Sequence, residues 1–141
     1  MKVLIVGAGA QGGPCASILA RDKDISEIVL GDIDLDLANK VKDKIRSDKL
    51  TTIKVDAGNI EDIGRAAEGV NVIINLIVTW FCSNIMRVAL KTGAHYVDAS
   101  FGEPILTQIM EKQPLGFDNE FKKAGLTALI GCGGSPGITN V

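Results

Sequence analysis

Aromatic residues are scarce in this sequence, whose 141 residues include only four Phe, one Trp and one Tyr. So few rings argue against a surface on which nucleic-acid bases could stack. An excess of positive charge is also lacking, because the formal net charge is −2. A protein that neutralises phosphates along a strand carries a marked surplus of Lys and Arg. The composition therefore excludes nucleic acid as a partner.

No apolar run in the sequence is long enough to span a membrane. The longest, residues 72–81, is interrupted by Asn75 and Thr79, and a spanning helix needs roughly 20 apolar residues. The apolar start at residues 3–6 is broken by glycine before it reaches the length of a secretory signal. We therefore expect a cytoplasmic protein that does not enter a membrane.

Cysteine and histidine are also too few for a metal site or a disulfide framework. Cys15, Cys82 and Cys132 are odd in number and far apart, so we expect reduced thiols and no metal. The only histidine, His95, is followed three positions later by Asp98. Because such residues face opposite sides of a strand, we expect His95 to be structural. The sequence leaves the catalytic residue unidentified.

Short aliphatic runs alternate with segments of helical spacing throughout residues 1–141, which have the size of one domain. The strand-like runs cover residues 2–6, 27–30, 51–55, 70–78, 95–99 and 126–130. The helical segments cover residues 11–22, 35–48, 60–68 and 80–91, with more helical material, broken near Pro114 and Gly116, before the last strand.

Aliphatic strands that are each followed by a helix predict an α/β fold with a parallel sheet covered on both faces. Right-handed crossovers then give a doubly wound sheet of about six strands in the order 3-2-1-4-5-6, the NAD(P)-binding Rossmann fold. Ligands bind such sheets beyond the carboxyl ends of the strands, near the switch point. The loops after Val6, Leu30, Val55 and Leu76 should therefore surround one crevice.

The loop after the first strand has the glycine pattern of a dinucleotide site. Gly7 permits the tight turn, Gly9 lets the backbone approach a pyrophosphate, and Gly12 allows the helix to pack on the strand. Ala10 and Gln11 complete the loop, and the helix that follows offers free N–H groups to an anion. The alternative is a glycine turn in an α/β fold that binds no cofactor.

An acidic residue at the end of the second strand completes this pattern. Asp32 stands 20 positions after Gly12 and can accept hydrogen bonds from the adenosine ribose. A 2′-phosphate would face Asp32, with Asp34 and Asp36 close by, and Ile33 occupies the position where a phosphate-binding Arg is often found. We therefore predict NAD as the cofactor, with NADP disfavoured. The alternative is that Asp32 is a solvated acid in a turn.

The third and fourth strands add further candidates for the cofactor site. Asp56 and Ala57, after the third strand, are placed to meet adenine, although Asp56 is equally compatible with a helix cap or turn. Asn75, Leu76 and Ile77 should line the path toward the nicotinamide ribose. Because Asn75 is polar within an apolar run, its amide needs a partner, which either the cofactor or a neighbouring loop could supply.

Several segments resemble the saccharopine dehydrogenase family, which includes saccharopine reductases, carboxynorspermidine dehydrogenase-like enzymes and lysine dehydrogenases. They are the glycine loop of residues 7–12, the His-Tyr-Val-Asp-Ala-Ser-Phe run of residues 95–101, and residues 124–141 with their Gly-Cys-Gly-Gly-Ser-Pro-Gly motif. The resemblance covers the whole chain. It implies an N-terminal NAD(P)-binding domain and a substrate domain after the Pro-Gly motif, so we expect that domain beyond residue 141.

The resemblance also implies the chemistry, which is hydride transfer between nicotinamide and the amine or imine carbon of an amino-acid-like substrate. By position, Ser100 and Phe101 match a segment that touches substrate, and Pro136 and Gly137 match a loop at the nicotinamide end. Some relatives carry Asp where Ser135 stands here. The exact substrate therefore does not transfer.

A different class of function stays open. Nucleotide-sensing regulatory domains of potassium-transport proteins share the glycine loop and the acid of the second strand, and would act without catalysis. They do not need a Gly-Pro loop beyond the sixth strand. Other nucleotide enzymes fit less well, because Tyr96 is followed four positions later by Ser100 and not by the Lys of short-chain dehydrogenases. A second copy of this chain remains a candidate partner.

Overall fold

A single parallel sheet forms the centre of the protein, as seen in a computed structural model that describes residues 1–99, 117–134 and 138. Its six strands are hydrogen-bonded in the order β3-β2-β1-β4-β5-β6, and every pairing is parallel. The predicted fold, strand number and strand order are therefore confirmed. The strands are β1 (Lys2–Val6), β2 (Glu27–Asp32), β3 (Leu50–Lys54), β4 (Val72–Asn75), β5 (His95–Asp98) and β6 (Ala128–Leu129).

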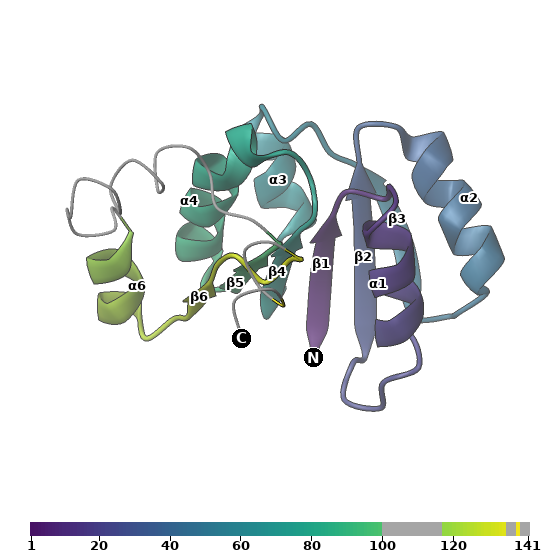
Figure 1. Ribbon diagram of the computed structural model, residues 1–141, viewed down its shortest axis with the longest axis horizontal. Coiled ribbons are helices and arrows are strands. Elements are labelled where there is room, and N and C mark those ends of the chain that lie inside the picture. The colour runs from purple at the N-terminus through teal and green to yellow at the C-terminus, as the bar shows by residue number, and fades with distance from the viewer. Residues whose placement is uncertain (100–116, 135–137, 139–141) are drawn as a thin grey trace.

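Helices cover both faces of this sheet (Figure 1). Val3 and Ile5 of β1 pack on one face with α1 and α2, whereas Leu4 and Val6 pack on the other with α3, α4 and α6. This division follows from the alternation of side chains along a strand that is buried on both sides. The helices are α1 (Gly12–Leu19), α2 (Leu35–Ile45), α3 (Ile60–Ala66), the 3-10 turn η1 (Thr79–Phe81), α4 (Cys82–Thr92) and α6 (Asp118–Ala124).

The largest departure from the sequence-based prediction is the fourth strand. We expected it to run over residues 70–78, but β4 ends at Asn75. Leu76, Ile77 and Val78 line a cavity, and Leu76 and Ile77 also pack against the core, so their apolar character does not require a longer strand. The helix that we expected from Trp80 begins at Cys82, after η1, and ends at Gly93 with a φ of 73°. The other expected elements that fall on described residues differ from the observed ones by a few residues at their ends, whereas the expected break near Pro114 and Gly116 lies outside the described residues.

No helix within the described ranges is both long and apolar enough to cross a membrane.

Candidate functional site

The glycine loop between β1 and α1 is shaped by contacts that leave no room for side chains. Gly7 has a φ of +105°, and a Cβ on it would lie 2.6 Å from Cγ2 of Ile77. A Cβ on Gly12 would lie 1.7 Å from the carbonyl oxygen of Gly7. Gln11, at the N-cap of α1, makes no capping hydrogen bond with its side chain. The loop therefore presents backbone N–H groups at a helix start, which is the arrangement that favours a bound anion.

Asp32, at the end of β2, is tied to this loop by its carboxylate. Its Oδ2 accepts a hydrogen bond of 2.7 Å from the N–H of Ala8, and its Oδ1 accepts one of 2.9 Å from the N–H of Asp34. Each carboxylate oxygen can accept more than one hydrogen bond. Asp32 can therefore hold the glycine loop and still accept from a ribose hydroxyl. The Asp34 side chain accepts from the N–H of Leu37 at the start of α2.

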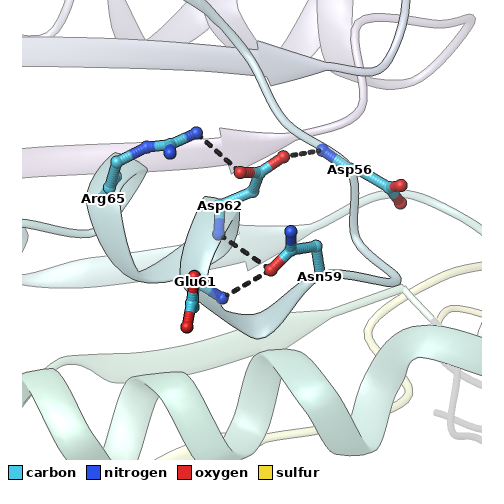
Figure 2. Close-up of polar contacts among 5 residues, drawn as sticks. All are labelled: Asp56, Asn59, Glu61, Asp62 and Arg65. Carbon is cyan, nitrogen blue, oxygen red and sulfur yellow. Dashed lines mark hydrogen bonds and ion pairs between the residues drawn. The ribbon is translucent and has the colours of Figure 1, made fainter.

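Figure 2 shows how the loop after β3 is fastened to α3. Asn59 caps α3 by accepting from the N–H groups of Glu61 and Asp62, and Asp62 accepts from the N–H of Asp56 at 3.4 Å and from Arg65 at 2.6 Å. The Asp56 carboxylate points away from α3 (Figure 2) and accepts from the N–H of a turn glycine at 2.8 Å. Asp56 is therefore a turn residue, as the alternative interpretation held, and it also lines the cavity described next.

These loops surround a cavity of about 620 Å³ at the carboxyl ends of the central strands, a size typical of small-molecule and cofactor sites. Most of the residues that we predicted to bind a cofactor line it: Gly7, Gly9, Ala10, Gln11, Asp32, Ile33, Asp56, Ala57, Leu76 and Ile77. The lining also includes residues that sequence reasoning did not select: Val6, Val55, Val78, Phe81 and Ala99. Of these, Phe81 could have been suspected, because it is an aromatic residue at the start of the helical segment after the fourth strand.

Two predicted cofactor residues lie beneath the cavity instead of in its lining. Gly12 is buried against Gly7. Asn75 was expected to line the crevice, but its side chain is buried and contacts the protein core: its Nδ2 donates to Oη of Tyr96 at 2.9 Å and to Sγ of Cys82 at 3.4 Å. Of the two partners considered for its amide, the structure therefore provides neighbouring protein groups.

Burial perturbs two titratable partners of Asn75. The pKa of the Cys82 thiol is raised mainly by burial. The pKa of the Tyr96 hydroxyl is raised strongly, first by burial and then by the charge of Asp98. Both groups are therefore neutral at pH 7, and the Tyr96 hydroxyl donates a hydrogen bond of 2.8 Å to Oδ2 of Asp98.

His95 takes the structural role that we expected. Its Nδ1 accepts a 3.0 Å hydrogen bond from the N–H of Thr127, just before β6. It is exposed, whereas Asp98 is buried. The two side chains thus lie on opposite faces, as the strand geometry predicts.

The residues that we expected to contact substrate have no described position in the structure. Ser100, Phe101, Pro136 and Gly137 lie outside the described residues. Within the described lining of the cavity, Asp32 and Asp56 are the acidic side chains. Both lie at the ends of β2 and β3, on the same side of β1, and the catalytic residue stays unidentified.

Comparison with known proteins agrees with this geometry. The family described as "Saccharopine dehydrogenase NADP binding domain" matches residues 3–129. Carboxyaminopropylagmatine dehydrogenase from Synechocystis is 31% identical over 143 residues, which cover 99% of this chain and 36% of the relative. Carboxynorspermidine synthase from Vibrio cholerae is 26% identical over 157 residues, covering 100% of this chain and 38% of the relative.

A solved structure also resembles this chain. The saccharopine dehydrogenase (L-Glu forming) of Saccharomyces cerevisiae superposes with a TM-score of 0.81 at 25% identity, covering 98% of this chain and 28% of that chain. The chain therefore spans little more than a third of the length of the curated relatives named above, and less of the yeast structure.

Proposed function

This chain belongs to the family of saccharopine dehydrogenase NADP-binding domains, and from this premise we propose that it is the cofactor-binding part of an oxidoreductase. The nicotinamide dinucleotide would occupy the 620 Å³ cavity. The observation that carries the proposal is the glycine loop, whose turn at Gly7 and close packing at Gly12 bring the loop at the start of α1 into the lining of that cavity.

The reaction we propose is hydride transfer between the nicotinamide and the amine or imine carbon of an amino-acid-like substrate. The names of the relatives support this class, since they describe carboxylated polyamines and a dehydrogenase that forms L-Glu. When bound, the dinucleotide supplies or accepts the hydride. The residues of this chain bind and orient it: the loop N–H groups hold the pyrophosphate, Asp32 the adenosine ribose, and Asp56 the adenine edge.

Hydride transfer also requires that the acceptor be held about 3–3.5 Å from the donor in a site closed to water. The cavity formed by the described residues is open to solvent and carries its acidic side chains near β2 and β3. We propose that a substrate domain closes over the nicotinamide end and completes the site. Ser100, Phe101, Pro136 and Gly137 are our candidates for substrate contacts from this chain.

We further propose that the domain prefers NAD to NADP. The 2′-hydroxyl of the adenosine ribose would lie at Asp32, and a phosphate there would meet this carboxylate and the Asp34 side chain at the N-cap of α2. Like charges this close near a surface repel by up to a few kcal/mol. Ile33, 63% exposed on the rim of the cavity, offers no compensating charge.

A titration with NADH and then with NADPH tests both parts of the proposal. The only tryptophan, Trp80, precedes the cavity residue Phe81, so energy transfer from Trp80 to bound NADH reports occupancy. We expect tighter binding of NADH than of NADPH. In the double variant Asp32→Ala, Ile33→Arg the ratio of the two dissociation constants should move toward NADPH by at least about tenfold, equivalent to about 1.4 kcal/mol.

Asp36→Ala is the matched control, because Asp36 lies in the first turn of α2 and outside the lining of the cavity. Its charge acts from farther away and is screened by salt, so the ratio should change by less than about threefold. Tighter binding of NADPH by the wild type would reject the NAD preference while leaving dinucleotide binding intact. Binding of neither cofactor, checked by calorimetry, would reject the proposed cofactor role of this domain.

A further inference from the structure

A chain of buried polar groups runs under the cavity, from the end of β4 to the end of β6. Its side chains are Asn75, Tyr96 and Asp98, none more than 2% exposed. They come from β4 and β5, adjacent strands that pair Ile73 with Tyr96 and Asn75 with Asp98. All three face the side of the sheet that α3, α4 and α6 cover, so this polar chain crosses an otherwise apolar core.

The hydrogen bonds of the polar chain have one consistent direction. The N–H of Ile77 donates to Oδ1 of Asn75 at 3.2 Å, and Nδ2 of Asn75 donates to Oη of Tyr96 at 2.9 Å. Tyr96 then donates to Oδ2 of Asp98 at 2.8 Å, and the N–H of Gly131 donates to Oδ1 of Asp98 at 2.8 Å. Because a backbone N–H can only donate, Ile77 fixes which way the Asn75 amide faces. Every bond therefore leads toward the Asp98 carboxylate.

One end of the polar chain reaches the wall of the proposed cofactor site. Ile77 and Leu76 line the cavity and lie against Gly7. The position that a Cβ of Gly7 would occupy is 2.6 Å from Cγ2 of Ile77 and 3.1 Å from the carbonyl oxygen of Leu76. Gly7 and this wall therefore pack with no room for even a methyl group between them, so a shift of Ile77 bears directly on the turn of the glycine loop.

We propose that Tyr96 is a positioning residue for the dinucleotide: acting through Asn75, it sets the Leu76–Ile77 wall and hence the glycine turn. This inference rests on the proposed cofactor role of the cavity. Tyr96 is fully buried and outside the lining, and its hydrogen bond toward the site runs through Asn75. Through Asp98 the same residue connects the wall to Gly131 at the end of β6.

The hydroxyl group of Tyr96 is the critical atom, because phenylalanine would fill the same core space without it. In Tyr96→Phe, Nδ2 of Asn75 would keep only Sγ of Cys82, a weak acceptor, at 3.4 Å. A buried amide that loses its acceptor favours movement toward a new partner. The Asn75 side chain can then rotate and release the N–H of Ile77.

Ligand pairs distinguish positioning from general support of the fold. NADH would span the whole cavity, whereas adenosine, which lacks the phosphate that the glycine loop would hold, would need only the end near Asp32 and Ile33. For Tyr96→Phe we expect NADH to bind about fivefold to tenfold more weakly, the effect of about one net hydrogen bond on an equilibrium, and adenosine to stay within about twofold of wild type. NADH binding is read from Trp80 fluorescence, adenosine binding from competition with NADH, and folding from circular dichroism.

Phe121→Leu is the matched control, because Phe121 is buried in the same core cluster on α6 and belongs neither to the polar chain nor to the lining of the cavity. It should lower stability and leave both affinities unchanged. Equal weakening of NADH and adenosine in Tyr96→Phe, or no weakening of either, would overturn the positioning role. If the wild type itself binds no NADH, the proposed cofactor role fails, which is a separate result.

Amide hydrogen exchange in the wild type tests the link without any variant. The N–H groups of Ile77 and Gly131 lie at the two ends of the polar chain. Saturation with NADH should slow exchange at both, although Gly131 is not part of the cavity lining. The N–H of Leu126, bonded to the carbonyl of Phe121, should be unaffected. Slower exchange at Ile77 with no change at Gly131 would refute the coupling.

Discussion

An aspartate stands near the end of a strand on each side of the central strand β1, and the two make different contacts. Asp32 on β2 is partly exposed, lines the cavity and accepts from the backbone N–H groups of Ala8 and Asp34. Asp98 on β5 is 2% exposed and accepts from the Tyr96 hydroxyl and the N–H of Gly131. The Asp32 carboxylate therefore holds its loop from a partly exposed position through two backbone N–H groups, whereas the Asp98 carboxylate is held in the core by one side chain and one backbone N–H group.

The difference has a functional reason in the proposed site. A carboxylate that must accept from ribose hydroxyls has to stay within reach of solvent, so Asp32 holds the glycine loop with part of its hydrogen-bonding capacity. The side of β4, β5 and β6 carries a wall that needs only a fixed position, and buried hydrogen bonds give such a position without exposure to the ligand.

The largest effect on this comparison is expected at Gly12, in the glycine loop that Asp32 holds. There the backbone of α1 packs directly on the backbone of Gly7. In Gly12→Ala the new Cβ would lie 1.7 Å from the Gly7 carbonyl oxygen, and neither backbone segment can move without breaking the loop. We expect a loss on the order of 3–5 kcal/mol in the free energy of unfolding, measured by urea denaturation. Gly13→Ala is the control, since its Cβ would meet nothing nearer than Cγ2 of Val41, at an ordinary contact distance of 3.6 Å. An unchanged urea midpoint in Gly12→Ala would mean that the backbone on this side yields easily.

The buried hydrogen bonds around Tyr96 should make the free energy of unfolding sensitive to alkaline pH. Burial holds the pKa values of Cys82 and Tyr96 above their ordinary values of 9.0 and 10.0. Above about pH 9 the unfolded chain releases these protons first, so the free energy of unfolding falls as pH rises. We expect urea denaturation at pH 8 and pH 10.5 to show a smaller loss for Tyr96→Phe than for wild type.

Cys15 provides the control for that experiment, because burial also raises its pKa on the α1 side of the sheet. Cys15→Ala should keep the part of the alkaline loss that comes from Tyr96 and Cys82. If Tyr96→Phe and wild type lose the same stability between the two pH values, Tyr96 does not contribute to the pH dependence.

The smallest expected effect lies at the start of α3, after β3, where the capping contacts are local. Asn59→Ala removes the cap of α3, whose side chain accepts from the N–H groups of Glu61 and Asp62. We expect a loss of about 1 kcal/mol, read from thermal unfolding. Arg65→Ala, which removes an ion pair with a 69% exposed Arg side chain, should cost less than about 0.5 kcal/mol. A larger loss for Arg65→Ala than for Asn59→Ala would contradict this order.

The β2 side was predictable from the sequence because its requirements are local. Gly7, Gly12 and Asp32 follow from how a backbone turns between a strand and a helix, and such constraints leave a short motif. The lining of the cavity by Ile33, Asp56 and Ala57 followed from the strand order. Whether these residues bind the cofactor stays a prediction.

The polar chain was not predicted, although part of its signal is present in the sequence. Tyr96 and Asp98 are two residues apart in a strand and so share a face, by the same rule that separates His95 from Asp98. Their link to Asn75 depends on the pairing of β4 with β5 and on the exact register of that pair. A short sequence motif predicts neither the pairing nor the register. The apolar residues Leu76, Ile77 and Val78 misled the prediction of strand length for a similar reason, since a binding wall and a buried strand have the same hydropathy.

The central position of β1 also affects how the protein is made. Its first partner, β2, follows closely in the chain, but its second, β4, pairs Val72 with Val3 and is synthesised much later. At roughly 5–20 residues per second, one edge of β1 waits for seconds on the ribosome with its backbone groups unpaired. A nascent β1–β2–β3 unit therefore exposes an unpaired strand edge, which favours aggregation. This exposure ends when β4 emerges and pairs with β1.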